Sequence, residues 1–190
     1  MITKAQSRIL LQIARDALKE AFEHKTVLVP HSIRKAKELL QPSGVFVTIL
    51  KNGQLRGSMG YPPGTYPLVD GVMRAARDAA FNDPRFKTVR SDEMHELRIR
   101  IDVLSKLAQV KPTQQAIGQS IKAGKHGVFV EYGPFKGLQL PEDAKKYKWT
   151  AKECVQKALQ KAGLAQEMWN DKSIKIYRFV TQVLEEKESK

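Results

Sequence analysis

The sequence is poor in the features that mark secreted and membrane proteins. Cys154 is the one cysteine among 190 residues, so no internal disulfide can form, and we expect a reducing, cytoplasmic location. No apolar run approaches the roughly 18 residues that span a bilayer. The opening residues Met1 to Lys4 lack the charged and then apolar layout of a signal peptide. No association with a membrane is therefore expected.

Motifs of several common chemistries are also missing. There is no glycine-rich phosphate loop ending in Lys-Ser or Lys-Thr, no Gly-x-Gly-x-x-Gly after a strand, and no Gly-x-Ser-x-Gly elbow. The histidines are dispersed, and no pair has the spacing of a structural zinc site: His24, His31, His95 and His126. We therefore predict neither a metal ion nor a cofactor, while a site assembled from distant segments stays open.

Positive charge is in clear excess. Thirty-three Lys and Arg stand against twenty Asp and Glu, which leaves a net charge of +13. Such an excess attracts nucleic acids and other polyanions. Lysine dominates it, however, and is spread along the chain, which is more typical of a solvated surface than of a recognition site. We therefore predict that any nucleic-acid binding is weak, non-specific and strongly dependent on salt.

Helices are predicted from caps and from apolar periodicity. In a capping box, a Thr side chain accepts a bond from a free backbone amide while a Gln or Glu side chain reaches back. Two pairs fit this pattern, Thr3 with Gln6 and Thr150 with Glu153, and an apolar stripe at helical spacing follows the first. We expect helices over 3–22, 32–40, 68–81 and 150–162.

Strands and hairpins make up the rest of the pattern. A β-branched run over 45–50 precedes Asn52-Gly53, a pair typical of a type I′ turn, so the chain should return through 54–58. Apolar and charged residues alternate over 97–103, which indicates a strand with one wet face in an antiparallel sheet. Further strands are predicted over 128–132, 138–140 and 174–183. The fold class is therefore α+β, with a mostly antiparallel sheet and flanking helices.

The segment Leu55–Gly60 is the first candidate site. Gly57 and Gly60 bracket Ser58 and allow backbone conformations closed to other residues, so their amides can form an anion-binding nest. Arg56 would add a bidentate grip on a carboxylate or phosphate. The alternative stays open that these glycines serve only a bulge or a turn.

Several motifs follow one another over nearly the whole chain: Gly44–Thr48, Asn52–Pro62, Ala79–Phe86, Gly124–Gly127, Gly137-Leu138, Leu140-Pro141 and Cys154 to Leu164. In content and order these segments resemble the AMMECR family, which is named after a human chromosomal region tied to Alport syndrome with elliptocytosis. The resemblance implies one domain over 1–190, built as two unequal lobes with the Leu-Arg-Gly motif near a cleft between them. It implies ligand-binding roles for Arg56, Gly57, Ser58, Gly60, Asp83 and Arg85.

The resemblance leaves the activity open. It implies either a binding or regulatory module or an enzyme. The module would take a small anionic ligand, a protein segment or a nucleic-acid segment, with a basic role near transcription, repair or translation. The enzyme would be associated with radical-SAM or Memo-type proteins and would use His126 as acid or base, with Ser58 and Arg56. The family usually carries Cys where this chain has Ser58. A serine hydroxyl needs an adjacent base to attack, so this departure favours binding over covalent catalysis.

Overall fold

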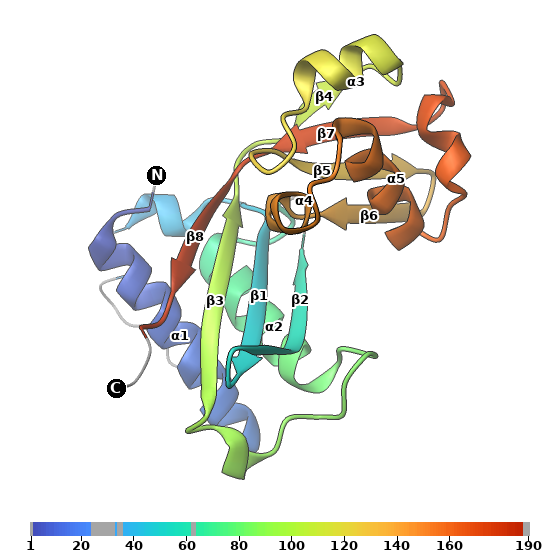
Figure 1. Cartoon of the computed structure of the whole chain (residues 1–190). Helices are drawn as coiled ribbons and strands as arrows, with labels where there is room; N and C mark the ends of the chain where they lie inside the picture. The colour runs from blue at the N-terminus through green and yellow to red at the C-terminus, as the bar shows by residue number, and fades with distance from the viewer. Residues whose placement is uncertain (1, 24–32, 34–35, 62–63, 188–190) are drawn as a thin grey trace. The chain divides into compact units, whose positions relative to one another are not determined.

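A computed structural model describes residues 2–23, 33, 36–61 and 64–187. The chain divides into two compact units (Figure 1). The first unit combines residues 1–104 with the C-terminal residues 182–190, and the second unit comprises residues 105–181. Each unit has its own four-stranded antiparallel sheet and its own buried apolar cluster. The predicted α+β class with antiparallel strands is confirmed, and the strands form two sheets where the sequence predicted one.

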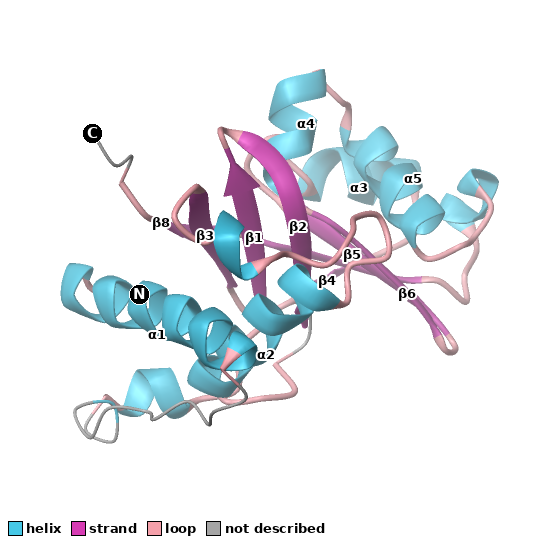
Figure 2. Cartoon of the chain, turned by 90° about the horizontal axis from the view of Figure 1, so that it is seen from below, coloured by secondary structure: helices cyan, strands magenta, loops and turns pink. Residues whose placement is uncertain are grey.

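The first unit is a sheet with helices α1 and α2 packed on one face (Figure 2). Its strands lie in the order β2-β1-β3-β8. The elements are α1 (Lys4–Phe22), β1 (Val45–Lys51), β2 (Gln54–Tyr61), α2 (Leu68–Phe81), β3 (Leu97–Leu104) and β8 (Thr181–Glu185), with short 3₁₀ helices η2 (Lys37–Leu40) and η3 (Ser91–Glu93). Every second residue along β1 and β3 is apolar and packs with the helices in the core.

Three local predictions in the first unit are confirmed: a helix cap, a helix and a turn. Thr3 accepts from the Gln6 amide and the Gln6 side chain accepts from the Thr3 amide, which completes the predicted capping box. Helix α2 spans the predicted residues. Asn52 and Gly53 have φ angles of 50° and 75°, as a type I′ turn requires, and they join β1 to β2.

The second unit has strands in the order β4-β7-β5-β6, with helix α5 against β5 and β6. Its elements are β4 (Ala108–Val110), α3 (Gln114–Ser120), β5 (Gly127–Tyr132), β6 (Phe135–Gln139), α4 (Pro141–Tyr147), α5 (Ala151–Lys161), the 3₁₀ helix η4 (Gln166–Asn170) and β7 (Lys175–Phe179). The capping box of Thr150 and Glu153 opens α5 as predicted. Cys154 is buried in the core of this unit, where burial raises the pKa of its thiol to about 11.

Some predicted boundaries differ from the structure. The prediction of a single strand over 174–183 is wrong, because the chain forms β7 in one sheet and β8 in the other, with Val180 between them. Ser105 and Val180 bond each other at this crossing, through the Ser105 amide and hydroxyl. The second hairpin strand begins at Phe135 rather than at 138, because the turn at Gly133-Pro134 is only two residues long. Within the predicted helix 32–40 the structure has η2, while residues 32 and 34–35 lie outside the described residues, as do His24, His31 and residues 62–63.

Candidate functional site

Arg56 lies at a β-bulge and is held inside its own unit. The β1–β2 register shifts between Ile49 and Leu50, so that Arg56 is the extra residue. Its guanidinium donates to both carboxylate oxygens of Glu93, at 3.1 and 2.9 Å, and to the carbonyls of Lys87 and Thr88. The Arg56 bond holds the pKa of Glu93 at about 2, against the opposing effect of burial. Arg56 therefore ties β2 to the segment 87–93.

Gly57 and Gly60 lie within strand β2, and neither has a positive φ angle. A Cβ atom on Gly57 would lie 2.0 Å from the Ala79 carbonyl oxygen of α2. A Cβ atom on Gly60 would lie 2.3 Å from the Val45 carbonyl oxygen. These glycines are thus needed for the close approach of α2 and of β1, and β2 has the extended backbone of a strand where a nest was predicted.

Ser58, Asp83 and Arg85 form one bonded cluster at the open edge of β2. The Ser58 amide donates to Asp83 Oδ2 at 2.8 Å, and Arg85 Nη2 donates to the Ser58 carbonyl at 3.2 Å. Asp83 also accepts from the Arg85 amide, Nε and Nη2. The Arg85 bonds hold the pKa of Asp83 at about 2, although burial opposes the shift. Asp83 and Arg85 together satisfy the backbone groups that a missing neighbouring strand would pair.

Arg85 differs from Arg56 because part of its guanidinium makes no hydrogen bond within the described residues. Its Nε and Nη2 atoms bond Asp83 and Ser58, while Nη1 has no partner among the described residues. The Arg85 side chain is 55% exposed, whereas the Arg56 side chain is 17% exposed. The Arg85 guanidinium also lies over the Phe86 ring, with Cζ 5.4 Å from the ring centroid. Arg85 therefore presents an oriented pair of N–H donors to solvent.

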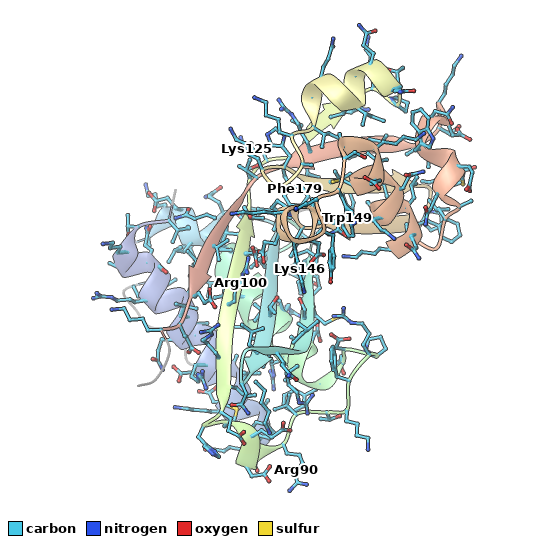
Figure 3. The ribbon with its side chains drawn as sticks, in the orientation of Figure 1. Arg90, Arg100, Lys125, Lys146, Trp149 and Phe179 are labelled. Atoms are coloured by element: carbon cyan, nitrogen blue, oxygen red, sulfur yellow. The ribbon has the colours of Figure 1, made fainter. Side chains whose placement is uncertain are left out.

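A polar row on the first sheet was missed by sequence reasoning. Ser58 Oγ lies 2.9 Å from Thr48 Oγ, and Thr48 pairs across β1 and β3 with Arg100. Arg100 bonds Asp102, whose side chain is only 1% exposed and whose pKa is raised by burial. Figure 3 shows Arg100 on β3. The alternation over 97–103 assigned Arg100 and Asp102 to one face, but strand register was needed to place Thr48 beside them, and Asp102 is buried where a wet face was predicted.

His126 belongs to the second unit, whereas Arg56, Gly57, Ser58, Gly60, Asp83 and Arg85 belong to the first. Its Nδ1 atom accepts from the Lys122 amide at 3.0 Å. Burial, with Arg178 and Lys125, lowers its pKa, while a hydrogen bond with the Ser120 backbone acts in the opposite direction. His126 is 8% exposed. These contacts give it a structural role within its own unit, and the catalytic role stays a prediction.

The fold and the site define an α+β protein of two antiparallel sheets with a polar cluster on the edge of the first. The AMMECR1 family model matches residues 11–184, which run through both units. The chain belongs to the AMMECR1 family.

Relatives of similar length support the same assignment. Protein TK0174 of Thermococcus kodakarensis is 35% identical over 182 residues, which cover 93% of this chain and 88% of that protein. NEQ441 of Nanoarchaeum equitans is 36% identical over 181 residues, covering 93% and 98%. The crystal structure of the uncharacterized protein PH0010 from Pyrococcus horikoshii superposes with a TM-score of 0.90 at 32% identity, covering 98% of this chain and 94% of that one. Among the residues that the structure describes, no helix has the length and apolar character to cross a membrane.

Proposed function

We propose that the chain is a binding module that holds a small anionic ligand at Arg85, beside Ser58 on the edge of β2. The observation that carries this proposal is the state of Arg85. Asp83 fixes the guanidinium through two of its nitrogens, and Nη1 stays exposed with no partner in the described part of the chain. A donor pair that is already oriented loses little conformational freedom when it binds a carboxylate or a phosphate oxygen.

Binding rather than covalent catalysis is favoured by the contacts of Ser58. A serine nucleophile needs a base within hydrogen-bond reach. The side-chain partner of Ser58 Oγ is the Thr48 hydroxyl, which is not a base at neutral pH. The Asp83 carboxylate bonds the Ser58 amide and Arg85 instead, and its low pKa makes it a poor proton acceptor. A cytoplasmic location, expected from the single buried cysteine, belongs to the same proposal.

Isothermal titration calorimetry with inorganic phosphate and with succinate tests the proposal. Arg85→Gln removes the exposed donors, and we expect it to weaken binding about tenfold, which corresponds to about 1.4 kcal/mol. Arg90→Gln is the matched control, because Arg90 also bonds an aspartate two residues away, Asp92, through Nε and Nη2, and is more exposed. It should leave affinity within about twofold. Equal losses in both variants, or no binding of either anion, would refute an Arg85 site.

A further inference from the structure

The second unit carries a partly exposed cluster of rings and lysines that the proposed anion site does not use. We call it the aromatic–lysine surface, and it consists of Lys146, Tyr147, Trp149, Lys152, Lys157 and Trp169. Lys146 lies in the last turn of α4 and Trp149 follows the helix, and Figure 3 shows both near α4. These residues come from the end of α4, from the link between α4 and α5, from α5 and from η4, which follow one another in the chain.

Two of the rings form an open stack. The Tyr147 and Trp149 centroids are 5.4 Å apart with 24° between the ring planes. Tyr147 is 56% exposed, whereas Trp149 is partly buried against the core of the unit. Trp149 therefore fixes the stack to the fold, and Tyr147 presents its ring to solvent. Exposing so much aromatic surface brings no benefit to folding, because an aromatic ring stabilises a fold by being buried.

Lysines lie over these rings. Lys146 Nζ is 5.1 Å from the Tyr147 centroid, Lys157 Nζ is 5.8 Å from that of Trp149, and Lys152 Nζ is 4.4 Å from that of Trp169. Lys146 and Lys152 pair with no carboxylate in the described ranges. Their charges are therefore available to a ligand that also contacts the rings.

The charge of the whole unit reinforces this surface. Residues 105–181 carry 14 Lys and Arg against 6 Asp and Glu, a net charge of +8 out of +13 for the chain. The loop that holds Lys122 and Lys125 lies beside α4, since a Cβ atom on Gly124 would be 3.4 Å from Lys145 Cβ. The positive charge thus continues from the aromatic–lysine surface into a neighbouring loop.

We propose that the aromatic–lysine surface binds single-stranded nucleic acid. Unpaired bases stack on aromatic rings without regard to sequence, while lysines contact the phosphates between them. In a duplex the base faces are already stacked on one another, so an exposed Tyr147 ring has no base face to contact. A polyanion without rings, such as an acidic peptide, would use the lysines but not the stack.

Fluorescence anisotropy of the full-length chain with labelled dT12 at 20 mM and 200 mM NaCl tests this surface. Tyr147→Ala should weaken binding at least fivefold, because it removes the exposed ring on which a base stacks. Phe135→Ala is the matched control, since Phe135 is an aromatic residue of the same unit that is 47% exposed. It should change affinity less than twofold.

The lysines are tested through the salt dependence. The double variant Lys146→Gln and Lys152→Gln should lower the magnitude of the slope of log K against log salt by about 1.4. Each phosphate contact on a single strand contributes about 0.7 to that slope, and this variant removes two. A 12-base-pair duplex and poly-glutamate should each bind several times more weakly than dT12. Arg85→Gln should weaken dT12 binding less than Tyr147→Ala does, which separates this site from the anion site of the first unit. Equal effects of Tyr147→Ala and Phe135→Ala, or equal binding of dT12, duplex and poly-glutamate, would overturn the proposal.

Discussion

At the scale of single residues, two arginines near the edge of β2 have opposite roles. Arg56 donates four hydrogen bonds inside the first unit and ties β2 to the segment that contains Glu93. Arg85 is oriented by Asp83 yet keeps Nη1 exposed. Both residues were predicted as ligand contacts from a glycine-flanked motif and a family resemblance. Contacts between residues distant in sequence decide which arginine is available to a ligand. Arg56 bonds Glu93, which is 37 residues away, and Asp83, which orients Arg85, bonds the Ser58 amide 25 residues away.

The Asp83 cluster predicts a pH-dependent contribution to stability. The pKa of Asp83 is lowered from 3.8 to about 2, so its contribution is present above about pH 4 and is lost as pH falls toward 2. Asp83→Asn should reduce the free energy of unfolding at pH 7 by about 2 kcal/mol, the size of hydrogen bonds to a charged group. Urea unfolding of the two proteins between pH 7 and pH 2.5 measures the difference. A difference that stayed constant down to pH 2.5 would contradict this role.

Ser58→Cys tests the local environment without a known ligand. Cys154 is 1% exposed with a pKa raised to about 11, so at pH 7 almost none of it is thiolate. A thiol at the half-buried position 58 should therefore react faster with iodoacetamide than Cys154 does. Thr48→Cys, on the neighbouring strand, is the control for general reactivity of this face. If position 58 has an apparent pKa below about 8.5, its surroundings stabilise a thiolate. A value at or above 8.5 gives no support to the enzyme alternative.

At the scale of elements, glycine sets the distance between strand and helix. Gly57→Ala would place a Cβ atom 2.0 Å from a backbone oxygen of α2, so α2 or β2 must shift. We expect a loss of about 1–3 kcal/mol in the free energy of unfolding, typical of overpacking. Gly118→Ala is the control, because a Cβ atom there meets nothing within 4 Å and the position lies within helix α3.

Gly118→Ala should raise the free energy of unfolding by about 0.5–1 kcal/mol, because Gly is unfavourable inside a helix. Thermal unfolding followed by circular dichroism compares both variants with the parent chain. Opposite signs for the two substitutions are the expected result. A neutral Gly57→Ala would show that α2 moves aside at no cost, and the close approach would then explain nothing about this glycine.

Elements with local signals were predicted well, and those fixed by distant contacts were not. The capping boxes at Thr3 and Thr150 and the turn at Asn52-Gly53 depend on residues within one or two turns of each other. The break between β7 and β8 depends instead on Ser105, which is 75 residues from Val180. No periodicity within 174–183 marks that break, because apolar and β-branched residues occur on both sides of it.

The candidate site follows the same division. The resemblance identified Ser58, Asp83 and Arg85, and the structure brings these three residues together. Thr48, Arg100 and Asp102 were not identified as site residues, because only the strand register places them in one row with Ser58. Arg56 was predicted to bind a carboxylate or phosphate ligand, because nothing near it in sequence indicates that Glu93 and two carbonyls bond it.

At the scale of the whole molecule, the two units differ in net charge and in tryptophan content. The second unit has a net charge of +8 in 77 residues, and the first has +5 in 113, so the lysine excess is not evenly spread. Both tryptophans, Trp149 and Trp169, belong to the second unit. Tryptophan fluorescence therefore reports unfolding of the second unit, whereas far-ultraviolet circular dichroism reports both.

This difference allows a test of whether the first unit depends on the C-terminal residues. Glu186 accepts from Arg15 Nε and Nη2 and from the Ile99 amide, which fixes the chain after β8 to α1 and β3. Glu186→Ala should lower the stability of the first unit by about 1–3 kcal/mol. The urea midpoint should then fall when measured by circular dichroism and not when measured by tryptophan fluorescence. Glu185→Ala, which removes a more exposed ion pair with Arg98, should shift it little. Equal shifts of both probes would mean that the two units unfold together.

The proposal of an anion site at Arg85 is tested most directly by amide chemical shifts. Inorganic phosphate is titrated into the ¹⁵N-labelled chain, and the same titration is repeated with Arg85→Gln and with Arg90→Gln. We predict the largest shifts at the amides of Ser58, Asp83, Arg85 and Phe86, lost in Arg85→Gln and kept in Arg90→Gln, because the Arg85 guanidinium bonds the Ser58 carbonyl and the Asp83 carboxylate. Shifts confined to the lysine-rich residues 105–181, or shifts at Ser58 that survive Arg85→Gln, would contradict the account.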